Sequence, residues 1–129
     1  MHVTQLRILI LACALSAGTH AALAPEHFRE TTAAGVGFVA SAAVLALLAV
    51  ALTRRPGVLE LVAAAAVLAG LLAAYAAAVT TGVPVLHPER EAVDGLAVVT
   101  KLIEALGLAA AVARLRLSVP NFEPKGSSA

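Results

Sequence analysis

Apolar residues fall in four long blocks, separated by short polar or proline-containing segments. Each block has about 20 residues, the length that a helix needs to cross roughly 30 Å of hydrocarbon. The blocks lack strand-type alternation, and helices or closed barrels are the only structures that satisfy the backbone in lipid. The pattern therefore predicts transmembrane helices near residues 6–24, 34–53, 58–80 and 93–115.

The breaks between the blocks indicate where the helices end. Pro25 is expected to end the first helix, and the Arg54-Arg55-Pro56-Gly57 segment predicts a tight turn between the second and the third. Residues 1–117 then form one membrane domain, an all-α four-helix transmembrane bundle. Residues 118–129, which contain two prolines and end in Gly-Ser-Ser-Ala, are predicted to be a flexible cytoplasmic tail.

Basic residues predict the orientation of the bundle. They flank the same end of each block, at Arg7, Arg54, Arg55, Arg114, Arg116 and Lys125. By the positive-inside rule, both termini face the cytoplasm and the acidic connections near residues 25–33 and 81–92 face outward. The alternative for the first block is a cleaved signal peptide that ends at Ala22-Leu23-Ala24, although Pro25 directly after the cut would hinder cleavage.

Composition supports a protein embedded in the cell membrane. The 129 residues are 60% hydrophobic and 13% charged, and the mean hydropathy is +0.93, well outside the usual soluble range. A net charge of +1 gives no basis for nucleic acid binding. The lone Cys13 excludes an intramolecular disulfide and dithiol chemistry, and the sequence has no phosphate loop or serine-nucleophile motif. It therefore favours a non-enzymatic protein.

Lys101 and Glu104 lie inside the fourth apolar block, about 12 and 16 Å below its start at Val93 by helical rise. Charges in hydrocarbon are costly, so they must be paired or line a wet cavity. Neighbouring blocks add polar groups at similar depth. The predicted intramembrane stripe consists of Asp94, Lys101, Glu104, Tyr75, Ser16 and Thr19.

This distribution predicts a polar outer half above a sealed inner half, which fits a binding pocket open to the outside. Three roles for the charged pair remain open. Lys101 and Glu104 neutralise each other and fix helix packing, with Tyr75 or Ser16 taking spare hydrogen bonds. Glu104 is instead protonated and takes part in proton or solute binding. In the third, the pair contacts a partner subunit.

Histidines and carboxylates cluster in the outer segments. Neutral imidazole with carboxylate suits zinc, copper or non-haem iron. The candidate metal ligands are His20, Glu26, His27, Glu30 and His87. The alternative is that His27 and His87 are solvated loop residues and that His20 bonds to a neighbouring helix. For haem, His20 and His87 are the only pair at similar depth, and the loop position of His87 argues against it.

Small residues predict association in the membrane. Gly18, Gly70 and the Gly35-Val-Gly37 segment lie in alanine-rich blocks, and small faces let helices approach closely in lipid. The partners would be other membrane subunits or further copies of the chain. The sequence therefore favours an accessory or interaction subunit of a membrane complex. The first alternative is an outward-facing protein that binds or transports a metal ion or small solute, and a membrane enzyme or redox carrier comes third.

Three motifs carry a resemblance to a known group. They are Ala-Pro-Glu-His-Phe-Arg-Glu at 24–30, Gly-Val-Gly-Phe at 35–38 and Thr-Thr-Gly-Val-Pro at 80–84, and Glu104 follows them. Over residues 20–112 the chain resembles small four-span membrane proteins of actinobacteria. The resemblance implies the fold and a membrane location but no activity. His20, Glu26, His27 and Glu104 match the group's pattern, whereas Lys101 and the short loop with His87 depart from it.

Overall fold

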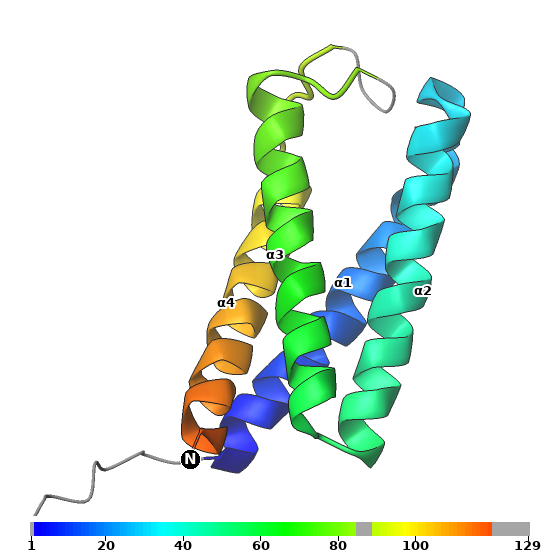
Figure 1. Cartoon of the computed structure of the whole chain (residues 1–129). Helices are drawn as coiled ribbons and strands as arrows, with labels where there is room; N and C mark the ends of the chain where they lie inside the picture. Colours follow the sequence, from blue (N-terminus) through cyan, green and yellow to red (C-terminus); the bar gives the residue numbers. More distant parts are fainter. Residues whose placement is uncertain (1, 85–88, 120–129) are drawn as a thin grey trace, which may run out of the picture.

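The computed structural model describes residues 2–84 and 89–119, and these form a bundle of four helices (Figure 1). The helices are α1 (His2–Glu30), α2 (Thr32–Arg54), α3 (Val58–Thr80) and α4 (Gly95–Ser118). Each is long and apolar enough to cross a bilayer. The prediction of an all-α transmembrane bundle is confirmed, and the chain is a small multi-pass integral membrane protein.

The prediction that the first helix ends at Pro25 is wrong, because α1 continues to Glu30. Proline inside a helix leaves the carbonyl four residues earlier, that of Ala21, without its usual donor. The helix continues because both sides of the proline are packed: Ala24 is 4% exposed and His27 is 6% exposed. The expected outer loop is thus the last turns of α1, and residue 31 alone joins it to α2.

The helices pack as a ring that is weakest on one side. α1 packs extensively on α2 and α4, and α3 packs on α4, whereas α2 and α3 contact each other least. Figure 1 shows α2 and α3 joined by a short turn at one end and standing apart toward the other. The start of α1 and the end of α4 lie at the end with this short turn. This agrees with the predicted placement of both termini on one side, while the side itself stays a prediction.

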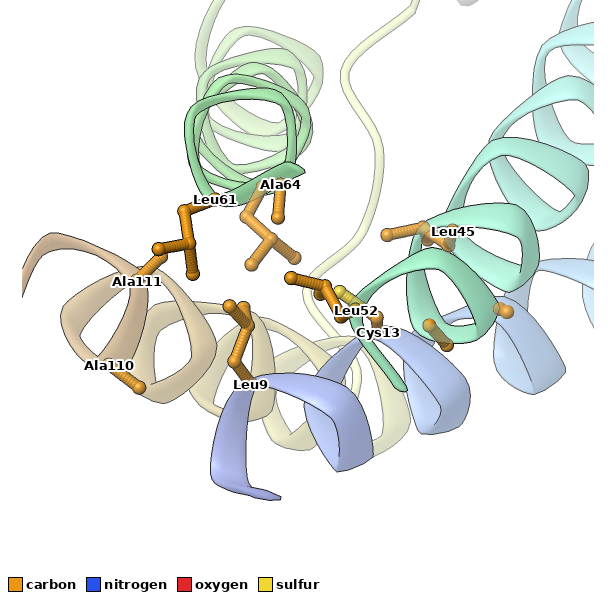
Figure 2. Close-up of a cluster of buried hydrophobic side chains, with 11 residues drawn as sticks. Leu9, Cys13, Leu45, Leu52, Leu61, Ala64, Ala110 and Ala111 are labelled. Carbon is orange, nitrogen blue, oxygen red and sulfur yellow. The ribbon is translucent and has the colours of Figure 1, made fainter. Parts of the chain in front are cut away.

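An apolar cluster closes the half of the bundle near the α2–α3 turn. All four helices contribute, and Figure 2 shows Leu9, Leu52 and Leu61 meeting between the helices. The cluster consists of Leu9, Cys13, Ala17, Leu45, Ala49, Leu52, Leu61, Ala64, Leu68, Ala110 and Ala111. This half contains the sealed, apolar interior that the sequence predicted for the inner side.

Close packing of α1 on α4 depends on Gly107. A Cβ atom added at Gly107 would lie 2.6 Å from the Ala12 Cβ and 3.1 Å from a Leu68 methyl group. Gly70, on an exposed face of α3, has nothing within 4 Å of the corresponding point. Comparing substitutions at the two glycines therefore distinguishes the effect of close helix packing from the general effect of glycine on helix stability.

We predict that Gly107→Leu destabilises the bundle by about 1–3 kcal/mol, the usual cost of overpacking a core. Gly70→Leu is the matched control and should leave stability unchanged or slightly raised. Thermal unfolding of both variants in a mild detergent measures the difference. Equal midpoints for the two variants would contradict the close approach of α1 and α4.

Candidate functional site

A cavity of about 450 Å³ occupies the half of the bundle opposite the apolar cluster. Its two sides differ in character. α1 and α4 contribute His20, Glu26 and Lys101, whereas the lining from α2 and α3 is mostly apolar and includes Phe38 and Leu71. The cavity therefore has a polar wall and an apolar wall, and it lies in the half for which the sequence predicted a polar interior.

Behind the polar wall, Glu104 is completely buried, with an exposure of 0%. Its Oε1 accepts a 2.6 Å hydrogen bond from the Ser16 hydroxyl of α1, and its Oε2 accepts a 2.7 Å bond from Lys101 Nζ. Lys101 itself lines the cavity, with a side chain 17% exposed. Both carboxylate oxygens are thus bonded, one to Lys101 on the same helix and the other to Ser16 on α1.

His20 lies one helical turn from Ser16 and is 6% exposed. Its Nδ1 is 2.8 Å from the Ser16 carbonyl oxygen and 3.3 Å from the Ser16 hydroxyl oxygen. A carbonyl oxygen only accepts hydrogen bonds, so Nδ1 carries the hydrogen, and the Nε2 of a neutral ring is an acceptor. Within the described residues both hydrogen bonds of His20 use Nδ1. His20 also lines the cavity.

His27 is buried at 6% exposure and is not the solvated loop residue considered from the sequence. Its ring stacks on Phe38 of α2 at a centroid distance of 3.6 Å, and the His20 ring lies 5.1 Å from the same phenyl ring. The Nε2 of His27 is 3.7 Å from a carboxylate oxygen of Glu91. His27 therefore ties α1 both to α2 and to the segment that precedes α4.

The remaining members of the predicted stripe do not join the buried network. Tyr75 lies beside it, with Lys101 Nζ 5.5 Å from its ring centroid, while its buried hydroxyl has no hydrogen-bond partner among the described residues. Thr19 donates to the carbonyl oxygen of Leu15 in its own helix. Asp94 caps α4 by accepting a 2.8 Å bond from the Ala97 N–H. All three residues line the cavity.

The candidate metal ligands do not converge within the part of the chain that the structure describes. No group of three or more histidine, cysteine or acidic side chains there is arranged to hold a metal ion. His20, Glu26, His27 and Glu30 all line the cavity. The predicted ligand His87 lies outside the described residues.

Sequence reasoning did not identify Phe38 and Glu91 as parts of this site. Phe38 stood in the Gly-Val-Gly-Phe motif, which was interpreted only as a resemblance. Its partners at positions 20 and 27 are seven residues apart, the spacing of two helical turns. That spacing would have pointed to a shared aromatic partner only if residues 25–30 had been expected to be helical.

Removing one partner of the buried pair should destabilise the bundle more than removing both. Lys101→Leu leaves the Glu104 carboxylate uncompensated, and breaking buried pairs in this way costs about 3–5 kcal/mol. We expect the Lys101→Leu, Glu104→Leu double variant to be more stable than Lys101→Leu alone. Unfolding midpoints in detergent measure both. A double variant less stable than the single one would show that the charge of Glu104 is not held by Lys101.

Comparisons with protein-family models, with curated proteins and with solved structures found no match for this chain. The resemblance to the actinobacterial four-span proteins therefore stays a prediction. Within the described residues, the geometry offers a half-polar cavity, the buried Lys101–Glu104 ion pair and the oriented imidazole of His20.

Proposed function

We propose that this protein binds a small amphipathic solute in the cavity between its four helices. The observation that carries the proposal is the division of the cavity into a polar wall on α1 and α4 and an apolar wall on α2 and α3. A solute with one polar group and a hydrocarbon body would satisfy both walls at once.

The size and construction of the cavity support this proposal. Its volume of about 450 Å³ lies within the range of roughly 300–1,000 Å³ that is usual for small-molecule sites. Two side chains of the polar wall are positioned by hydrogen bonds within the protein. His20 bonds to the Ser16 carbonyl oxygen, and Lys101 bonds to Glu104. Binding groups that are locked before the ligand arrives lose little conformational freedom on binding.

Closure of the other half favours binding over conduction. The apolar cluster leaves the cavity without a polar continuation toward the α2–α3 turn. With the orientation predicted from the basic residues, the solute would be taken up from the outer side of the membrane. The proposed role is thus the small-solute alternative that the sequence left open.

Tyr75 gives a direct test, because it is the only tyrosine of a chain without tryptophan and it lines the cavity. Intrinsic fluorescence of the purified protein in lipid vesicles therefore reports on this site. We expect a saturable change with at least one of three spectroscopically silent probes, 3-cyclohexylpropylamine, 3-cyclohexylpropan-1-ol and 3-cyclohexylpropanoate.

Gly37→Leu serves as the variant that fills the cavity. Gly37 lines the cavity, and a Cβ atom there would meet nothing within 4 Å, so a leucine occupies open space without a clash. We expect this variant to lose the response and Gly70→Leu to keep it. A response that survives in Gly37→Leu would report partition into lipid and would count against the cavity as a binding site.

The accessory-subunit hypothesis keeps support from a different face of the bundle. Ala14, Gly18 and Ala22 repeat at every fourth position on an exposed side of α1 and line a shallow groove with Leu96 of α4. Small residues at this spacing let a further transmembrane helix approach closely. This surface lies apart from most of the cavity, so the two roles are compatible.

We predict that Gly18→Leu weakens association with a partner helix, while Gly70→Leu does not, since both glycines have open space around them. Cross-linking in native membranes, followed by mild-detergent purification, measures the associated fraction for each variant. Equal fractions in wild type and both variants would remove this surface from consideration.

A further inference from the structure

We infer that the polar group of the bound solute is a positively charged amine, so that the ligand is an amphipathic organic cation. The inference rests on the proposed function and specifies its ligand class. Three observations carry it: the charges along the cavity lining, the pairing of the one lysine there, and the acceptor that His20 presents.

Carboxylates dominate the charged groups around the cavity. Among the described residues, the lining includes Glu26, Glu30, Glu91 and Asp94 against a single lysine, Lys101. These acids lie where α1 ends and α4 begins, so they surround the end of the cavity that faces away from the apolar cluster. A cleft lined by one sign of charge raises the local concentration of the opposite ion and repels its own.

Lys101 does not reverse this balance, because its charge is compensated by Glu104. The two groups are 2.7 Å apart, and the carboxylate is completely buried. An anionic ligand at Lys101 would meet an ammonium group whose charge the Glu104 carboxylate already neutralises. It would also have to pass the acids at the mouth. Anion binding is therefore disfavoured at both positions.

His20 supplies the matching acceptor inside the cavity. The Ser16 carbonyl oxygen holds the hydrogen of the neutral ring on Nδ1, which leaves a lone pair on Nε2. An ammonium group has only donors, so an oriented lone pair is the partner it requires. A neutral alcohol can use the same lone pair but gains nothing from the four carboxylates.

The cavity does not suit a bare metal ion, because within the described residues no three histidine, cysteine or acidic side chains are arranged to hold one. Phe38, Leu71 and Ala74 form much of the opposite wall and offer no ligand to a metal. These side chains would instead cover the hydrocarbon body of an amine whose head lies at His20.

The three cyclohexyl probes test the charge of the ligand, because they share one carbon skeleton and differ in the functional group at its end. At neutral pH the amine is a cation, the alcohol is neutral and the propanoate is an anion. Titrations followed by Tyr75 fluorescence should show the amine binding about tenfold more tightly than the alcohol, as charge-assisted hydrogen bonds are stronger than neutral ones. The propanoate should bind most weakly.

The outcomes separate this inference from the proposed function. Equal affinities for amine and alcohol would overturn the cation inference and leave a binding cavity in place. Tightest binding of the propanoate would overturn it as well and would assign the recognition to Lys101. Absence of binding for all three probes would overturn the inference together with the proposed function.

Two variants test the groups that are argued to recognise the cation. Glu26→Gln keeps the shape of an exposed rim residue and should reduce the preference for amine over alcohol by about two- to fivefold. Its matched control is Glu60→Gln at the start of α3, at the opposite end of the bundle, which should leave the preference unchanged. His20→Phe should weaken amine binding about tenfold. An unchanged preference in both Glu26→Gln and His20→Phe would overturn the inference.

Discussion

The buried carboxylate of Glu104 is the constraint on which the architecture depends. No water is present in a bilayer interior, so a charged group there must find all its partners within the protein. Glu104 finds one on its own helix, Lys101, and one on α1, Ser16. The bond to Ser16 also fixes the register of two antiparallel helices. One turn from this bond in one direction, Gly107 of α4 lies against Ala12 of α1. One turn in the other direction brings His20 to the cavity.

This register separates a closed half from an open half. On the side of Gly107, small residues let α1 and α4 approach each other, and leucines from the other helices fill the remaining space. On the side of His20, ring contacts hold the helices in two pairs. Phe38 joins α2 to α1 through two imidazoles, and Tyr75 of α3 lies near Lys101 of α4. Few contacts join α2 to α3, so space remains between the pairs.

The sequence predicted the parts of this structure that follow from periodicity and from the cost of charge in lipid. The four helices and an inward-facing Glu104 both follow from the positions of apolar and charged residues along single helices. The continuation of α1 through Pro25 did not, because local rules for proline describe the loss of one hydrogen bond and omit the packing that outweighs it. The burial of His27 was missed for the same reason.

Contacts between helices were predictable only where chemistry left few alternatives. A buried carboxylate requires a donor, and Ser16 was one of very few at the right depth, so its bond to Glu104 was within reach of the sequence. Phe38 had no such requirement, because an aromatic ring packs against many kinds of neighbour. The position of Glu91 beside His27 also depends on the path of the segment before α4, for which the apolar pattern gives no signal.

The hydrogen-bond chain in the polar wall has a direction that determines what the cavity can offer a ligand. Lys101 and Ser16 both donate to Glu104, and the His20 Nδ1–H points back to the Ser16 carbonyl oxygen. One donor at each of these three positions is thus directed at an acceptor inside the protein, and within the described residues the hydrogen bonds of His20 leave its Nε2 unused. With carboxylates at the mouth, the site presents acceptors and negative charge. A lysine in the wall is consistent with a cationic ligand, because Lys101 neutralises Glu104 and so stabilises the hydrogen-bond chain that orients His20.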